Sequence, residues 1–165
     1  MSDVKVLVAV ASKHGATEGI AQAIAARLNE LGLDAEARSV QDVRDIGDVR
    51  ALVLGSAVYA GSWMKEAIDF AERNADAVSD VPVWLFSSGP LGTEVTDEEE
   101  QPRQLGDLTQ MLKPNEHRVF FGALDKGKLG FAERMMVKAV KAPEGDFRDW
   151  DAIRGWADQI ASDLN

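Results

Sequence analysis

The sequence predicts an α/β fold in which a parallel sheet of five strands is covered by helices on both faces, as a three-layer sandwich. Short apolar runs alternate along the chain with segments whose apolar residues recur every three or four positions, a pattern typical of βαβ units with right-handed crossovers. Residues 51–55 are apolar without alternation, as in strands that are buried on both faces of a parallel sheet. No internal repeat or low-complexity linker interrupts the pattern, so we expect residues 1–165 to form one domain.

The individual elements follow from these patterns. Strands are expected at residues 4–11, 33–40, 49–57, 81–86 and 117–124. Each of four expected helices has an apolar stripe: Ile20, Ile24, Leu28 and Leu31; Trp63, Ala67, Phe70 and Ala71; Leu105, Leu108 and Leu112; and, from about Asp149, Trp150, Ile153, Trp156, Ile160 and Leu164. Five such strands fit the order 2-1-3-4-5, in which ligands bind beyond the carboxyl ends of the first and third strands.

Composition excludes several classes of protein. The chain has no cysteine, which excludes disulfides, thiolate catalysis and cysteine-held zinc or iron–sulfur clusters. Its net charge of −10 argues against nucleic-acid binding and suits either solubility or steering toward a basic partner protein. No apolar stretch is long enough to span a membrane, and no signal peptide is present, so we expect a cytoplasmic protein.

The loop after the first strand has the composition of an anion site. It consists of Ser12, Lys13, His14, Gly15, Ala16 and Thr17 and leads directly into the first helix. Backbone N–H groups of such a loop and of the first helical turn converge on one point, hydroxyls add donors, and glycine allows a close approach. Neither the Walker-A pattern nor the dinucleotide Gly-x-Gly-x-x-Gly fingerprint is present, so the expected ligand is a phosphate of another kind.

Two further loops are rich in glycine and small residues. One follows the third strand and contains Ala57, Val58, Tyr59, Ala60 and Gly61. The other follows the fourth strand and contains Ser88, Gly89, Pro90, Leu91 and Gly92. Because the carboxyl ends of parallel strands meet at one edge of the sheet, both loops are expected beside the phosphate loop. The three loops together are our candidate site.

The run Ser-Lys-His-Gly-Ala-Thr resembles the flavodoxin phosphate loop, Ser/Thr-x-Thr-Gly-x-Ser/Thr, with His14 in place of the central threonine. The resemblance to flavodoxin-domain proteins covers nearly the whole chain. It implies that FMN binds noncovalently, with its monophosphate on residues 12–17 and its isoalloxazine ring between the other two loops. The third loop carries no aromatic residue, so Tyr59 is the residue placed to lie against the ring, and the other ring face would be open to a substrate.

The last third of the chain is similar to the menaquinone-dependent protoporphyrinogen IX dehydrogenase group, in residues 119–124, 133–136 and 145–150. This resemblance implies an FMN-dependent oxidoreductase of heme biosynthesis that takes hydride equivalents from a porphyrinogen and passes electrons to a quinone. No side chain stands out as an acid or base, and no catalytic residue is nominated. An NAD(P)H:quinone reductase, a non-enzymatic electron carrier and a flavin-free interaction module remain alternatives.

Residues 125–142 form an insertion that the minimal fold does not need, with five cationic and two anionic residues. If residues 131–141 are helical, apolar and basic side chains lie on adjoining faces. Such a helix packs on its own domain, covers an acidic substrate, or meets a quinone or anionic lipid through residues 126–141 at the inner face of the membrane. Of the two histidines, His117 has no evident partner and is expected to be structural. No spacing of His, Asp and Glu predicts a metal site.

Overall fold

The computed structural model describes residues 5–12, 15–59, 62–89, 104–120, 123–124, 145–146 and 148–164. Its main sheet is parallel along the order β2-β1-β3-β5-β6, which is the predicted order 2-1-3-4-5. The strands of this path are β1 (Lys5–Ala11), β2 (Asp34–Ser39), β3 (Ala51–Tyr59), β5 (Val83–Ser88) and β6 (Glu116–Phe120). The predicted fold class is therefore confirmed.

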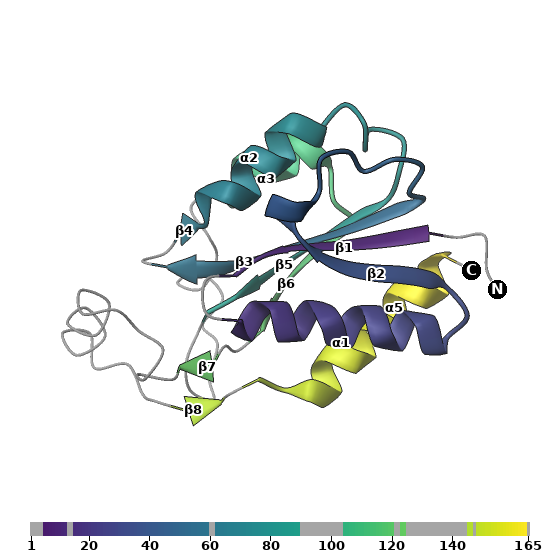
Figure 1. Ribbon diagram of the computed structural model, residues 1–165, viewed down its shortest axis with the longest axis vertical. Helices are drawn as coiled ribbons and strands as arrows, with labels where there is room; N and C mark the ends of the chain where they lie inside the picture. The colour runs from purple at the N-terminus through teal and green to yellow at the C-terminus, as the bar shows by residue number, and fades with distance from the viewer. Residues whose placement is uncertain are drawn as a thin grey trace.

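Helices cover both faces of this sheet, as the three-layer prediction requires (Figure 1). On one face lie α1 (Ala16–Glu30) and α5 (Trp150–Leu164). On the other lie α2 (Lys65–Asn74) and α3 (Leu105–Leu112). A short 3-10 helix, η1 (Val40–Asp42), follows β2. Asp149 caps α5 by accepting the Ala152 N–H at 3.0 Å.

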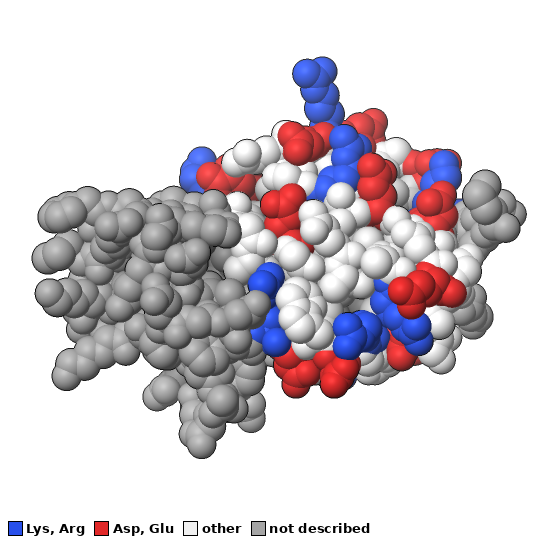
Figure 2. All heavy atoms as spheres, turned by 60° about the horizontal axis from the view of Figure 1, so that its bottom comes forward, with Lys and Arg blue, Asp and Glu red and all other residues white. Residues whose placement is uncertain are grey.

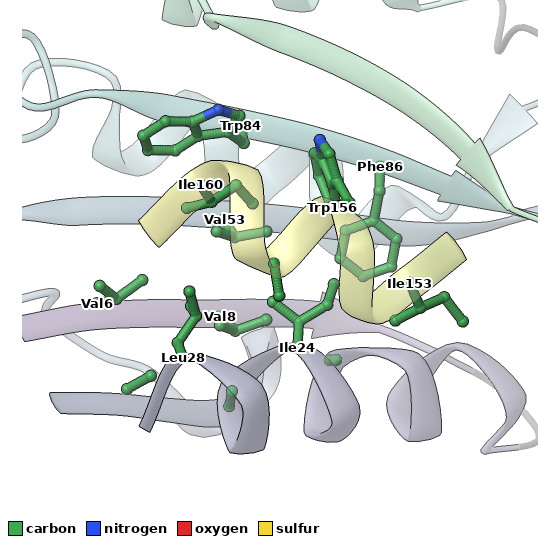
Figure 3. Close-up of a cluster of buried hydrophobic side chains, with 14 of the residues drawn as sticks. Val6, Val8, Ile24, Leu28, Val53, Trp84, Phe86, Ile153, Trp156 and Ile160 are labelled. Atoms are coloured by element: carbon green, nitrogen blue, oxygen red, sulfur yellow. The ribbon is translucent and has the colours of Figure 1, made fainter. Parts of the chain in front are cut away.

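The apolar stripes form two separate cores. The core beneath α1 and α5 contains the buried Ile20, Ile24, Leu28, Ile153, Trp156 and Ile160, together with Trp84 and Phe86 of β5 (Figure 3). The core beneath α2 and α3 contains Ala67, Phe70, Ala71, Leu108 and Leu112. β1 and β3 contribute side chains to both cores, one from each face. This explains why successive residues of these two strands are apolar instead of alternating with polar ones.

Two residues of the predicted helical stripes lie outside helices. Trp63 belongs to β4 (Ser62–Trp63), a two-residue strand that pairs antiparallel with the end of β3. Its side chain is still buried in the core beneath α2. Leu31 follows the last residue of α1 and is 37% exposed, because Gly32 ends the helix in a left-handed conformation at φ 92°. The stripe of α1 therefore ends at Leu28.

The fifth strand is shorter than predicted. It ends at Phe120, and the last predicted strand residues form β7 (Ala123–Leu124) in a separate sheet, paired antiparallel with β8 (Gly145–Asp146). Ala123 and Leu124 pair with Asp146 and Gly145, which follow the insertion, rather than with β5. The predicted helix at 131–141 lies outside the described residues.

The side that carries α1 and α5 has acidic and basic side chains interspersed (Figure 2). Arg27 of α1 joins the two helices by pairing with Asp158 of α5, with 2.6 Å between Nε and Oδ1. No helix in the described part of the chain is long and apolar enough to cross a membrane.

Candidate cofactor site at the carboxyl edge of the sheet

The three candidate loops leave the sheet at the same edge. Register pairs Ala11 at the end of β1 with Ser56 of β3, and Ser56 with Ser87 of β5. Ala57 and Ser88, one residue further on, are also paired. The first turn of α1 and the β7–β8 pair lie toward this same side of the molecule, away from the two chain ends (Figure 1). The sequence prediction that strand order would gather these loops is correct.

The first loop is closed by its own side chain. Ser12 Oγ accepts the Gly15 N–H at 3.1 Å, and Gly15 takes a left-handed conformation at φ 89° directly before α1. No described side chain caps this end of α1, so its first backbone N–H groups are offered to a ligand. Thr17 is buried at 2% exposure, and Ala16 is half-buried. Lys13 and His14 lie outside the described residues.

The second and third loops contact one another as they leave the sheet. β3 runs to Tyr59 and turns back into β4, where Val58 pairs with Trp63. A Cβ built on Gly89 would lie 2.9 Å from the Val58 carbonyl oxygen and 3.1 Å from the Val58 Cβ. Only glycine lets the third loop approach the second this closely. The predicted site residues Ala60, Gly61, Pro90, Leu91 and Gly92 lie outside the described residues.

Buried hydrogen bonds lie directly beneath these two loops. Ser56 Oγ accepts the Met64 N–H at 3.0 Å and donates to the Ala57 carbonyl at 2.8 Å. Trp63 donates its indole N–H to Ser87 Oγ at 2.8 Å. Ser87 Oγ is also 2.7 Å from His117 Nε2, so the expectation that His117 lacks a partner is wrong. Burial lowers the pKa of His117 to about 4, which keeps its imidazole neutral near pH 7.

A positive charge lies beside the first turn of α1. The Arg148 guanidinium stacks on the Trp150 ring, 4.7 Å from its centroid, and donates to the Ala16 carbonyl at 3.2 Å. A Cβ built on Gly19 would lie 2.7 Å from Arg148 Nη1, so the guanidinium lies close to the backbone of this helix. Sequence reasoning used residues 145–150 only for the family resemblance and missed this contact, because nothing in the sequence relates them to α1.

The comparison with known protein families decides the family. The model described as "Flavodoxin domain" matches residues 7–151, which is most of the chain. The chain belongs to the flavodoxin domain family. It is 20% identical over 171 residues to the protoporphyrinogen IX dehydrogenase (quinone) of Escherichia coli strain K12, covering 95% of this chain and 94% of that protein. The proteins with that name from E. coli O6:H1 and O157:H7 match to the same extent.

Solved flavodoxin structures share the fold. One from the domain Archaea superimposes with a TM-score of 0.67 at 15% identity, over 98% of this chain and 99% of that one. Flavodoxin 1 from Bacillus cereus gives a TM-score of 0.65 at 14% identity, with the same coverage. The flavodoxin of Streptococcus pneumoniae TIGR4 gives 0.62 at 18% identity, covering 97% and 99%.

Membership of the flavodoxin domain family implies FMN as the cofactor, and the described residues fit it. A Cβ built on Gly15 would meet no described atom within 4 Å, so no described residue fills the space beside the start of α1, where a phosphate would lie. The backbone N–H groups there form the kind of anion site that a phosphate monoester requires. The tight contact of Gly89 with Val58 brings the second and third loops together where the ring would bind.

Proposed function

We propose that this flavodoxin-domain protein binds FMN at the carboxyl edge of the sheet and acts as a protoporphyrinogen dehydrogenase with a quinone as electron acceptor. The observation that carries the cofactor assignment is the start of α1, where Ser12 closes the loop through Gly15 and the helix is uncapped by any described side chain. The substrate assignment is supported by similarity to the E. coli dehydrogenase over 95% of this chain, which takes in the insertion that follows β6.

The chain's own residues bind and orient the cofactor in this proposal. The N–H groups at the start of α1 and the Ser12 hydroxyl hold the phosphate, while residues 57–61 and 88–92 bracket the ring. Arg148 adds positive charge near the same helical turn. FMN, when bound, supplies two-electron redox chemistry. Each turnover removes two electrons and two protons from the porphyrinogen and converts one quinone to a quinol.

The substrate is tested by mixing FMN-loaded protein with protoporphyrinogen IX and a soluble menaquinone analogue without oxygen. Fluorescent porphyrin should form in proportion to the quinone consumed.

The competing function is a non-enzymatic electron carrier, which is favoured by the net charge of −10, because an acidic surface steers basic redox proteins toward it. Reduction of a basic cytochrome without porphyrinogen oxidation would support the carrier. Quinone reduction that requires NAD(P)H would support an NAD(P)H:quinone reductase.

The phosphate site is tested by two glycine substitutions at opposite ends of α1. Gly15 and Gly32 have nearly the same left-handed conformation, at φ 89° and φ 92°, and a Cβ on either would meet no described atom within 4 Å. Gly15→Ala and Gly32→Ala should therefore cost similar backbone strain, about 1 kcal/mol. Gly15→Ala should also weaken FMN binding about tenfold or more, because the added methyl group occupies the phosphate site. Flavin fluorescence titration measures both dissociation constants.

The matched control decides what such a loss means. Gly32→Ala should leave the FMN dissociation constant within about twofold of the wild-type value, because Gly32 lies at the opposite end of α1 from the proposed phosphate site. A tenfold change would need about 1.4 kcal/mol of lost binding energy. If both substitutions weaken FMN binding equally, the loss comes from strain in α1. If the Gly15→Ala variant binds FMN as tightly as the wild type, the phosphate does not bind at this loop. The membrane or quinone contact through residues 126–141 belongs to the same proposal, and anionic vesicles in a flotation assay test it.

A further inference from the structure

Trp63 lies next to the second loop and forms hydrogen bonds with Ser87 and Gln104. The third loop lies in the chain segment between these two residues. Its backbone N–H donates to Gln104 Oε1 at 3.1 Å, directly before α3. Its indole N–H donates to Ser87 Oγ at 2.8 Å, two residues before Gly89. Through β4 it also pairs with Val58. One residue, through its backbone and its side chain, therefore connects the loop after β3 with the start and the end of the chain segment that follows β5.

Trp63 and His117 both contact the Ser87 hydroxyl, and the first of these hydrogen bonds has a fixed direction. An indole nitrogen can only donate, so Ser87 Oγ accepts from Trp63 and has its single hydrogen left to donate. Its other partner is His117 Nε2, at 2.7 Å; a hydroxyl oxygen can accept two hydrogen bonds, so the tautomer of the imidazole decides which of these two groups donates. Ser87 is fully buried and Trp63 is 3% exposed. Because buried polar groups that lose a partner are costly, this arrangement holds Ser87 in one geometry.

We propose that Trp63 is a positioning residue for the flavin ring, acting through Ser87 to set the separation of the second and third loops. The inference rests on the proposed FMN site. Its physical basis is that Ser87 and Trp63 belong to the two chain segments that carry those loops, whereas the rest of the Trp63 ring is in the core beneath α2. A small change in this separation alters contacts to the ring more than it alters the global stability.

The test is Trp63→Phe, which keeps an aromatic ring in the core but removes the donor to Ser87. FMN should bind about three- to tenfold more weakly, the range expected for one hydrogen bond, and the absorption maxima of the bound flavin should shift. Ser87→Ala should weaken binding by a similar factor. The double variant should lose no more than either single variant, because both substitutions break the same bond.

Trp84→Phe is the matched control. Trp84 is as buried as Trp63, at 1% exposure, but lies in the core on the opposite face of the sheet. Trp84→Phe should lower the urea midpoint at least as much as Trp63→Phe. It should leave the FMN affinity within twofold of the wild-type value and the absorption maxima of the bound flavin unshifted. Hydrogen exchange of the FMN-free proteins should be faster at residues 57–59 and 88–89 in Trp63→Phe only.

The outcomes separate this inference from the proposed function. If the wild-type protein binds no FMN, both are overturned. If the wild type binds FMN and Trp63→Phe binds it equally tightly with an unchanged spectrum, only the positioning role is overturned. The same conclusion follows if Trp84→Phe weakens binding as much as Trp63→Phe, because loss of core packing would then explain both.

Discussion

Replacing Gly55 by alanine should lower the free energy of unfolding by about 2–4 kcal/mol, at the upper end of what overpacking costs. A Cβ on this residue of β3 would lie 2.1 Å from Cζ of the Phe86 ring on the neighbouring strand. Phe86 cannot swing aside, because it is fully buried and its ring is in contact with those of Phe120 and Trp156, each at a centroid distance of 6.1 Å. Urea unfolding followed by circular dichroism measures the loss.

Gly155→Ala provides the control for the same chemical change without the clash. Gly155 lies inside α5, where a Cβ would meet no described atom within 4 Å, so alanine should stabilise the protein by about 0.5–1 kcal/mol through helix propensity. Adding Phe86→Leu to Gly55→Ala should recover part of the lost stability, because the smaller side chain makes room for the methyl group. Equal effects of Gly55→Ala and Gly155→Ala would contradict the packing argument.

Most of the fold could be predicted because its signals are local and periodic. The spacing of Ile20, Ile24 and Ile153, all of which are fully buried, predicts the apolar stripes of α1 and α5. The continuous apolar runs predict the strands that are buried on both faces. β4 could not be predicted, because a strand of two residues has no periodicity. The β7–β8 pair, which splits the predicted fifth strand, could not be predicted either, because each of its strands has only two residues. The exposure of Leu31 depends on where α1 ends, and the spacing alone extends the stripe by one residue too many.

The candidate site was predictable at the level of loops but not of contacts. Parallel strands bring their carboxyl ends to one edge, so glycine-rich loops after β1, β3 and β5 had to be neighbours. The hydrogen bond between Ser87 and His117 joins residues 30 positions apart and depends on the register of β5 and β6, which a single sequence does not reveal. The approach of Arg148 to Ala16 spans 132 positions, so it too comes from tertiary packing.

The pH dependence of stability should report the partly buried imidazole of His117. Its pKa in the folded protein is about 4 because of burial, against about 6.5 when unfolded. Between these values the unfolded state binds more protons, so the folded state loses stability as the pH falls from about 6.5 toward 4. Between pH 7.5 and pH 5 the loss should be about 1–2 kcal/mol, after a discount for the partial exposure of the ring.

His117→Gln isolates this contribution, because the glutamine amide oxygen can accept from Ser87 but does not titrate. Urea unfolding at pH 7.5 and pH 5 should show a smaller drop in the variant, by the same 1–2 kcal/mol. His14, the other histidine, is present in both proteins and cancels in the comparison. Glu116, whose pKa is lowered by its hydrogen bonds from Arg118 and Trp156 despite the opposing effect of burial, also cancels. Equal drops in the two proteins would mean that burial does not hold His117 neutral.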